Sequence, residues 1–194
     1  MPNERDIKNI DDARALKALA HPLRLDLLEA VKHRGPLTAT EAAEIVGESP
    51  ANCSWHLRQL EKYGFIEVVP GSTGRQRPYQ RTATWYDWKD TGPDPEWDAA
   101  SRALTEVFID REVELIKQAR SRPQPEGWAE SSLAAQTILW LDLAEAERLG
   151  SAIIALLDEY KSRLLDPSQR PHDSRPFRFL TIGAADDNLG DRHD

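Results

Sequence analysis

The signals that start and stop helices are closely spaced in the first third of the chain, and they limit the fold more than any other feature. Thr38 is a good N-cap residue and Glu41 follows three positions later, which is the capping-box pattern of a helix start. Gly47 ends this helix, and Ser49 with Pro50 starts the next one. The sequence therefore predicts a short helix, a tight turn and a second helix.

Two more helices and a hairpin are predicted around this pair. The runs "DDARALKALA" and "HPLRLDLLEAVKHRG" each carry apolar residues at helical spacing, and the second restarts at Pro22 and ends at Gly35. After the helix over residues 49–63, "FIEVV" predicts a strand, "PGSTG" a turn, and "RQRPYQRT" a returning edge strand with Pro78 in it. A short helix, a glycine turn, a polar-faced helix and a following hairpin are the parts of a winged helix-turn-helix domain.

The helix over residues 49–63 is expected to bury one face and expose the other. Cys53, Leu57 and Leu60 align on the apolar face with His56 beside them. The opposite face carries amide, hydroxyl and cationic groups, which read base edges and phosphates in a major groove. The candidate DNA-binding residues of this helix are Ser49, Ala51, Asn52, Ser54, Trp55, Arg58, Gln59 and Lys62.

The returning strand of the hairpin adds basic residues at alternate positions. Arg75, Arg77 and Arg81 are expected on one face of it, where they would contact the phosphate backbone. An edge strand kept basic only to prevent aggregation is the alternative. The hairpin over residues 65–82 is thus predicted to be a DNA-binding wing.

Charge is unevenly distributed along the chain, whose formal net charge is -8. Residues 1–82 hold 12 Lys and Arg against 11 Asp and Glu, and residues 83–194 hold 13 against 22. A local basic face suits phosphate contact, whereas the acidic remainder is expected to stay away from nucleic acid.

These segments resemble a known family. "LKALAHPLRLDLLEAV", "TATEAAEIVGESPANCSWHLRQLEKYGFIEVV" and "PGSTGRQRPYQRT" are similar in order and spacing to the parts of ArsR-like winged helix-turn-helix transcriptional regulators, including the pattern Ser54-x-His56-Leu57-x-x-Leu60. The resemblance covers residues 11–82 and implies a dimeric regulator of double-stranded DNA. Metal-sensing members carry paired cysteines in the segment that matches "EAAEIVG", which has none, so a soft-metal sensor of that type is not expected.

Other chemistry has little support in the sequence. Cys53 is the single cysteine and the five histidines show no ligand spacing, so we expect no metal and no cofactor. No phosphate loop, carboxylate pair or nucleophile motif suggests an enzyme. Packing is the favoured role of Cys53, and a redox role is left open. The charged N-terminus and the absence of a membrane-length apolar run predict a cytoplasmic protein.

The chain changes character after the wing. Trp85, Tyr86 and Trp88 precede a break at Gly92 and Pro93, which we take as the end of a first domain, residues 1–90. These aromatic side chains are expected to pack at the seam with the following segment. The alternative is an aromatic pocket between domains for a small-molecule effector.

A long amphipathic helix is predicted in the linker, residues 91–122. It has more apolar surface than a small winged domain covers, so we expect a homodimer with two recognition helices one DNA turn apart on a palindromic operator. Packing within its own chain is the alternative. The candidate dimerisation residues are Trp97, Leu104, Phe108 and Leu115.

The C-terminal segment, residues 127–194, is predicted to be a small α/β unit with a disordered tail. "QTILWL" and "PFRFLTIGA" are candidate strands, and Asp142 with Glu145 starts a helix that reaches about Leu165. The sequence as a whole predicts a mainly helical regulator with small sheets. A winged-helix module for protein–protein assembly is the other candidate, and the effector, the operator and the direction of regulation stay open.

Overall fold

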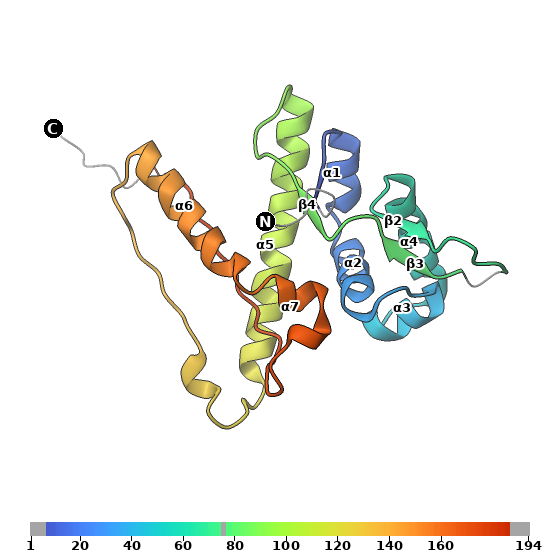
Figure 1. Cartoon of the computed structure of the whole chain (residues 1–194). Coiled ribbons are helices and arrows are strands. Elements are labelled where there is room, and N and C mark those ends of the chain that lie inside the picture. The colour runs from blue at the N-terminus through green and yellow to red at the C-terminus, as the bar shows by residue number, and fades with distance from the viewer. Residues whose placement is uncertain (1–6, 75–76, 187–194) are drawn as a thin grey trace. The chain divides into compact units, whose positions relative to one another are not determined.

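The computed structural model describes residues 7–74 and 77–186, and the chain divides into two compact units, Met1–Lys117 and Gln118–Asp194. Short 3-10 helices cover Ala129–Ser131 and Pro167–Gln169. The strands and α-helices (Figure 1) are β1 (Ile7–Asn9), α1 (Ala13–Leu19), α2 (Pro22–Arg34), α3 (Ala39–Val46), α4 (Pro50–Lys62), β2 (Ile66–Val68), β3 (Tyr79–Arg81), β4 (Trp85–Asp87), α5 (Pro95–Ser121), α6 (Leu143–Asp158) and α7 (Ser162–Leu165).

The first four helices begin and end where local capping chemistry places them, which confirms the four helices predicted. At the start of α3 the Glu41 amide donates to Thr38 Oγ1 at 3.3 Å, and the Thr38 amide donates to Glu41 Oε2 at 2.8 Å. Ser49 Oγ accepts from the Asn52 amide at 3.2 Å and caps α4. Because these contacts are local, the sequence alone specifies where each helix begins.

Two small sheets complete the first unit. β2 and β3 pair antiparallel with Val68 opposite Tyr79, so the predicted hairpin is confirmed, and Leu37 forms a further bridge to Tyr79. β1 and β4 pair in parallel, with Ile7 opposite Trp85, and neither of these strands was expected from the sequence. Lys8 Nζ donates to the Gly64 carbonyl at 2.6 Å, which ties β1 to the end of α4.

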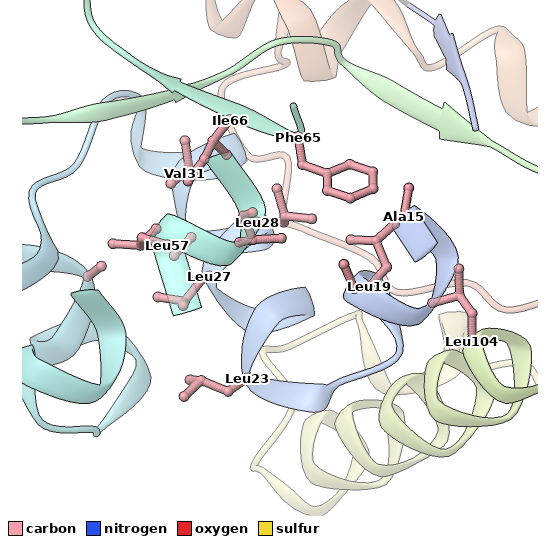
Figure 2. Packing of buried hydrophobic residues seen from close by; sticks show 14 of the residues in the cluster. Ala15, Leu19, Leu23, Leu27, Leu28, Val31, Leu57, Phe65, Ile66 and Leu104 are labelled. Atoms are coloured by element: carbon pink, nitrogen blue, oxygen red, sulfur yellow. The ribbon is translucent and has the colours of Figure 1, made fainter. Parts of the chain in front are cut away.

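The hydrophobic core lies among α1, α2, α4 and the start of β2, and Figure 2 shows its side chains converging from these elements. Burial of each large apolar side chain stabilises the fold by about 1.5–3 kcal/mol, so this core holds α4 firmly against α2. The largest fully buried side chains include Leu16, Leu27, Leu57, Leu60, Phe65, Ile66 and Leu104.

The N-terminal half of α5 packs on the same core, which corrects part of the predicted dimerisation seam. Trp97 is 5% exposed and Leu104 is 0% exposed, and Figure 2 shows Leu104 pointing toward Leu19 and Ala15 of α1. The side chains of Trp97 and Leu104 are therefore covered by residues of their own chain and are not available to a dimer partner. Figure 1 shows the same arrangement, with α1 alongside α5.

Further along α5, a charged side chain fixes the helix to α2. Arg111 is only 10% exposed, and its Nε donates to Asp26 Oδ1 at 2.7 Å while its Nη2 donates to Glu29 Oε2 at 2.6 Å. Charge-assisted bonds of this kind have a fixed fork geometry. The position of α5 on the domain is therefore set by polar contacts as well as by apolar packing.

The aromatic side chains before α5 pack at the junction. The Tyr86 hydroxyl donates to the Phe65 carbonyl, and Trp88 meets Phe108 edge-on with ring centroids 6.3 Å apart. At Gly92 a Cβ atom would lie 2.1 Å from the Trp97 ring, so the backbone here approaches the indole more closely than any side chain would allow. These contacts agree with packing at a seam, the interpretation preferred from the sequence.

The second unit agrees with the sequence analysis only in its helix. Asp142 and Glu145 form the predicted capping box at the start of α6. The two predicted strands are wrong, because within described residues 118–186 no segment pairs as a strand. A strand needs a neighbouring edge for its hydrogen bonds, and none is present in this part of the unit. The predicted disordered tail lies mostly beyond residue 186, outside the described residues.

Candidate nucleic-acid interface

The turn between α3 and α4 is set by its backbone hydrogen bonds. Gly47 adopts a left-handed conformation with φ of 73°, and the amides of Gly47 and Glu48 both donate to the Ala43 carbonyl, at 2.9 and 3.1 Å. Glycine takes this conformation without a steric penalty, so the chain can reverse at once into the Ser49 cap. α4 therefore leaves α3 in a defined direction.

The inner face of α4 is buried as predicted, and it includes a polar side chain. Cys53, Leu57 and Leu60 are 0% exposed, and His56 is 5% exposed. The His56 ring lies 4.5 Å from the ring of His21, centroid to centroid. Burial lowers the pKa of His56, and His21 and Arg24 lower it further.

The outer face of α4 presents the predicted DNA-binding side chains. Trp55 is half exposed and its ring stands edge-on to His56, with centroids 4.7 Å apart. Asn52, Ser54 and Gln59 are partly buried. Asn52 and Gln59, seven residues apart, share one flank of this face, and Ser54 lies on the other flank. The exposed residues on this face or at its ends are Ser49, Ala51, Arg58 and Lys62.

Two side-chain hydrogen bonds order this outer face. Arg58 Nη1 donates to Ser54 Oγ at 2.9 Å, one helical turn back. Asn52 Nδ2 donates to Glu48 Oε2 at 3.0 Å. Glu48 was not among the predicted residues, although its position four residues before Asn52 is a spacing that brings side chains together at a helix start.

The three predicted wing arginines have different surroundings. Arg77 is exposed beside the hairpin. The Arg81 guanidinium lies over the Tyr86 ring, 4.7 Å from its centroid, and its Nε is buried without a hydrogen-bond partner among the described residues. Arg75 lies outside the described residues. Only Arg77 is therefore seen as a solvent-facing cation of the wing.

Tyr79 connects the wing to α4. Burial raises the pKa of the Tyr79 hydroxyl and Glu61 adds to the rise, whereas Arg77 and Arg58 oppose it. Tyr79 is therefore within electrostatic reach of one arginine from the wing and one from α4. Sequence reasoning missed this residue, although its place between Arg77 and Arg81 in the period-two pattern was visible.

The described residues contain no cluster of metal ligands and no membrane-spanning helix. No three His, Cys, Asp or Glu side chains come together there as metal ligands. A shallow pocket of about 270 Å³ is lined by residues that include Lys8, Asp11, Lys62 and Tyr63, and not by the junction aromatics. No described helix has the length and apolar character needed to cross a membrane.

A known family and a solved structure are similar to parts of this chain. Residues 19–69, which run from the end of α1 past β2, match the family described as "Helix-turn-helix domain". The crystal structure of transcriptional regulator Tm0710 from Thermotoga maritima is 14% identical, with a TM-score of 0.29 over 75% of this chain and 76% of that one. No curated protein sequence matches the chain. Residues 19–69 thus match a helix-turn-helix domain, in which α3 and α4 are the two helices that flank the turn.

Proposed function

We propose that this protein is a sequence-specific DNA-binding transcriptional regulator, ArsR-like in type, in which α4 enters the major groove. The outer face of α4 carries the proposal. It gathers Asn52, Arg58 and Gln59 on one side of a helix whose other side is fixed in the core. A helix that only covers a core has no need of this combination of amide and guanidinium groups.

Each polar side chain suits a different part of the duplex. Asn52 and Gln59 match adenine and Arg58 matches guanine, through paired hydrogen bonds. Trp55 is exposed enough to contact a thymine methyl group or to pack on the sugar–phosphate edge. Ser54 orients Arg58 through its hydroxyl. The ends of the face, Ser49, Ala51 and Lys62, are proposed to contact the backbone.

The wing is proposed to hold a phosphate beside the groove. Arg77 is the exposed cation available for this contact, and Arg75 is proposed to share the role. Arg81 stacks on Tyr86, so we propose that it fixes the wing on β4 and does not itself reach the phosphate.

A homodimer on a palindromic operator is part of the proposal. The C-terminal half of α5 keeps Phe108, Val113 and Leu115 only partly buried within its own unit. Two copies joined along this half of the helix would present two recognition helices, and half-sites about 34 Å apart would suit them. We propose no metal effector, because the chain has no cysteine pair.

The test is an affinity measurement on short duplexes over a range of salt concentrations, by fluorescence anisotropy. DNA binding that releases counterions gives a steep negative slope of log affinity against log salt. Arg77→Ala should weaken binding to every duplex and reduce the slope by about one. Gln59→Ala should weaken binding to the preferred operator by about 1–3 kcal/mol and leave a scrambled duplex unchanged.

Arg102→Ala is the matched control, because Arg102 is an exposed arginine of α5 and lies away from the wing. It should change neither affinity nor slope. If the wild type binds no duplex specifically at any salt concentration, the proposal fails and the alternative, a winged-helix module for protein–protein assembly, takes its place.

A further inference from the structure

The proposed interface includes an acidic side chain at the end that enters the groove. Glu48 lies in the turn between Gly47 and the Ser49 cap, and it is exposed. A carboxylate at this position repels phosphates and lowers the affinity for DNA in general. A role in recognition would account for its presence beside the amides, hydroxyls and cations of this face.

The position of Glu48 is well defined. Its amide donates to the Ala43 carbonyl at 3.1 Å, and its Oε2 accepts from Asn52 Nδ2 at 3.0 Å. Among the residues that the structure describes, no basic side chain forms an ion pair with it. Glu48 lies at the N-terminal end of α4, where the helix dipole attracts negative charge.

The chemistry of a carboxylate in the major groove is selective. It only accepts hydrogen bonds, and cytosine N4 and adenine N6 are the base groups that donate there. Guanine O6 and N7 and thymine O4 are acceptors, and they repel it. Asn52, with one amide hydrogen engaged by Glu48, keeps its second amide hydrogen and its Oδ1, the pair that adenine requires.

We propose that Glu48 is a specificity-determining residue, which selects cytosine at one operator position next to the base contacted by Asn52. This inference rests on the proposed function. Glu48 contributes by rejecting guanine and thymine at that position, and it disfavours adenine because the N7 acceptor lies beside the N6 donor. It lowers the affinity for unrelated sequences at the same time.

The experiment is selection of bound duplexes from a randomised pool, followed by affinity measurements on the selected operator and its single-base variants. Three proteins are compared: the wild type, Glu48→Gln and Glu44→Gln. Glu44 is an exposed acidic residue of α3, so its variant makes the same change of charge within the same domain. Both substitutions are at exposed positions, and equal thermal unfolding would show that the fold is kept.

The expected result is confined to one position. The wild type should prefer cytosine there by about fivefold to tenfold, and Glu48→Gln should lose that preference. The same variant should bind scrambled duplexes more tightly than the wild type. Glu44→Gln should keep the wild-type preference at every position.

Two results would overturn the inference. One is a Glu48→Gln variant that selects the same operator with the same preference at every position. The other is an equal gain in affinity for all duplexes with both variants, which would show that Glu48 acts only as a general repulsive charge. A wild type that enriches no sequence would instead remove the proposed function itself, so the two failures are distinguishable.

Discussion

Cys53 shows how a single residue is constrained beneath the recognition helix. It is 0% exposed on the inner face of α4, and burial raises the pKa of its thiol, with Glu48 adding to the rise. The thiolate is the form that reacts with peroxide, so this thiol is a poor redox sensor. The packing role preferred from the sequence agrees with this environment.

Peroxide treatment should therefore leave DNA binding unchanged in the native protein. Cys53→Ala should behave like the wild type in the same anisotropy assay. Cys53→Asp, which places a charge where an oxidised sulfur would be, should abolish binding because a buried unpaired carboxylate costs several kcal/mol. Loss of binding on oxidation in the wild type, absent in Cys53→Ala, would establish a redox role instead.

Arg81 shows what could not be predicted at the residue scale. Period-two spacing placed it with Arg77 on one strand face, but β3 begins at Tyr79 and Arg77 lies before it. Its partner, the Tyr86 ring, belongs to β4, which is held in place by β1 from the start of the chain. A contact that depends on pairing between distant segments leaves no local mark in the sequence.

At the scale of elements, α2 and α4 meet through a cluster of polar rings and a cation. His56 Nδ1 and Arg24 Nε are buried without hydrogen-bond partners among the described residues. Burial lowers the pKa of His21, and Arg24 lowers it further. The folded domain therefore favours the neutral form of both His21 and His56.

Stability should fall as pH falls through the ordinary range of histidine, because the unfolded chain takes up protons that the folded domain resists. Urea unfolding at about pH 7.5 and about pH 5.5 measures this loss. His56→Gln should show a smaller difference between the two conditions than the wild type. His172→Gln is the control, since His172 is exposed, and it should keep the wild-type difference. Equal differences in all three proteins would contradict the assignment.

Elements with local signals were predictable, and those that depend on distant partners were not. The helices from α1 to α4 follow caps and apolar spacing, and the wing follows its turn. The three-residue strands β1 and β4 are too short to show an alternating pattern of apolar residues. Most of the sequence of the first unit also separates the two strands that pair. "QTILWL" and "PFRFLTIGA" have strand-like composition, but a strand also needs a neighbouring strand for its hydrogen bonds. Composition does not show whether such a neighbour is present.

The whole molecule exposes many apolar side chains outside the helix-turn-helix domain. In the second unit Trp140 is 72% exposed and Leu143 is 77% exposed, and α6 has no buried residue. Exposed apolar surface on this scale is typical of chains that associate. This agrees with the proposed homodimer, in which the C-terminal half of α5 takes part.

Leu115→Asp should separate the dimer, because a carboxylate in an apolar interface costs several kcal/mol without a partner. Sedimentation velocity at micromolar concentration measures the change. Ala103→Asp places the same charge on an exposed position of α5 and should leave the dimer intact. A wild type that sediments as a monomer would remove the two-fold docking from the proposal. A Leu115→Asp variant that stays dimeric would move the interface away from α5.

The close approach of Gly92 to Trp97 has a consequence for inheritance. The indole occupies the space that a Cβ at position 92 would need, and its Nε1 donates to the Lys89 carbonyl at 3.0 Å, while the Gly92 amide donates to Asp98. A mutation of the glycine alone displaces the ring, and a smaller ring alone leaves a gap. Positions 92 and 97 should therefore change together in descendants of this chain. A glycine paired with a tryptophan at this spacing would then mark related chains even where the rest of the junction has diverged.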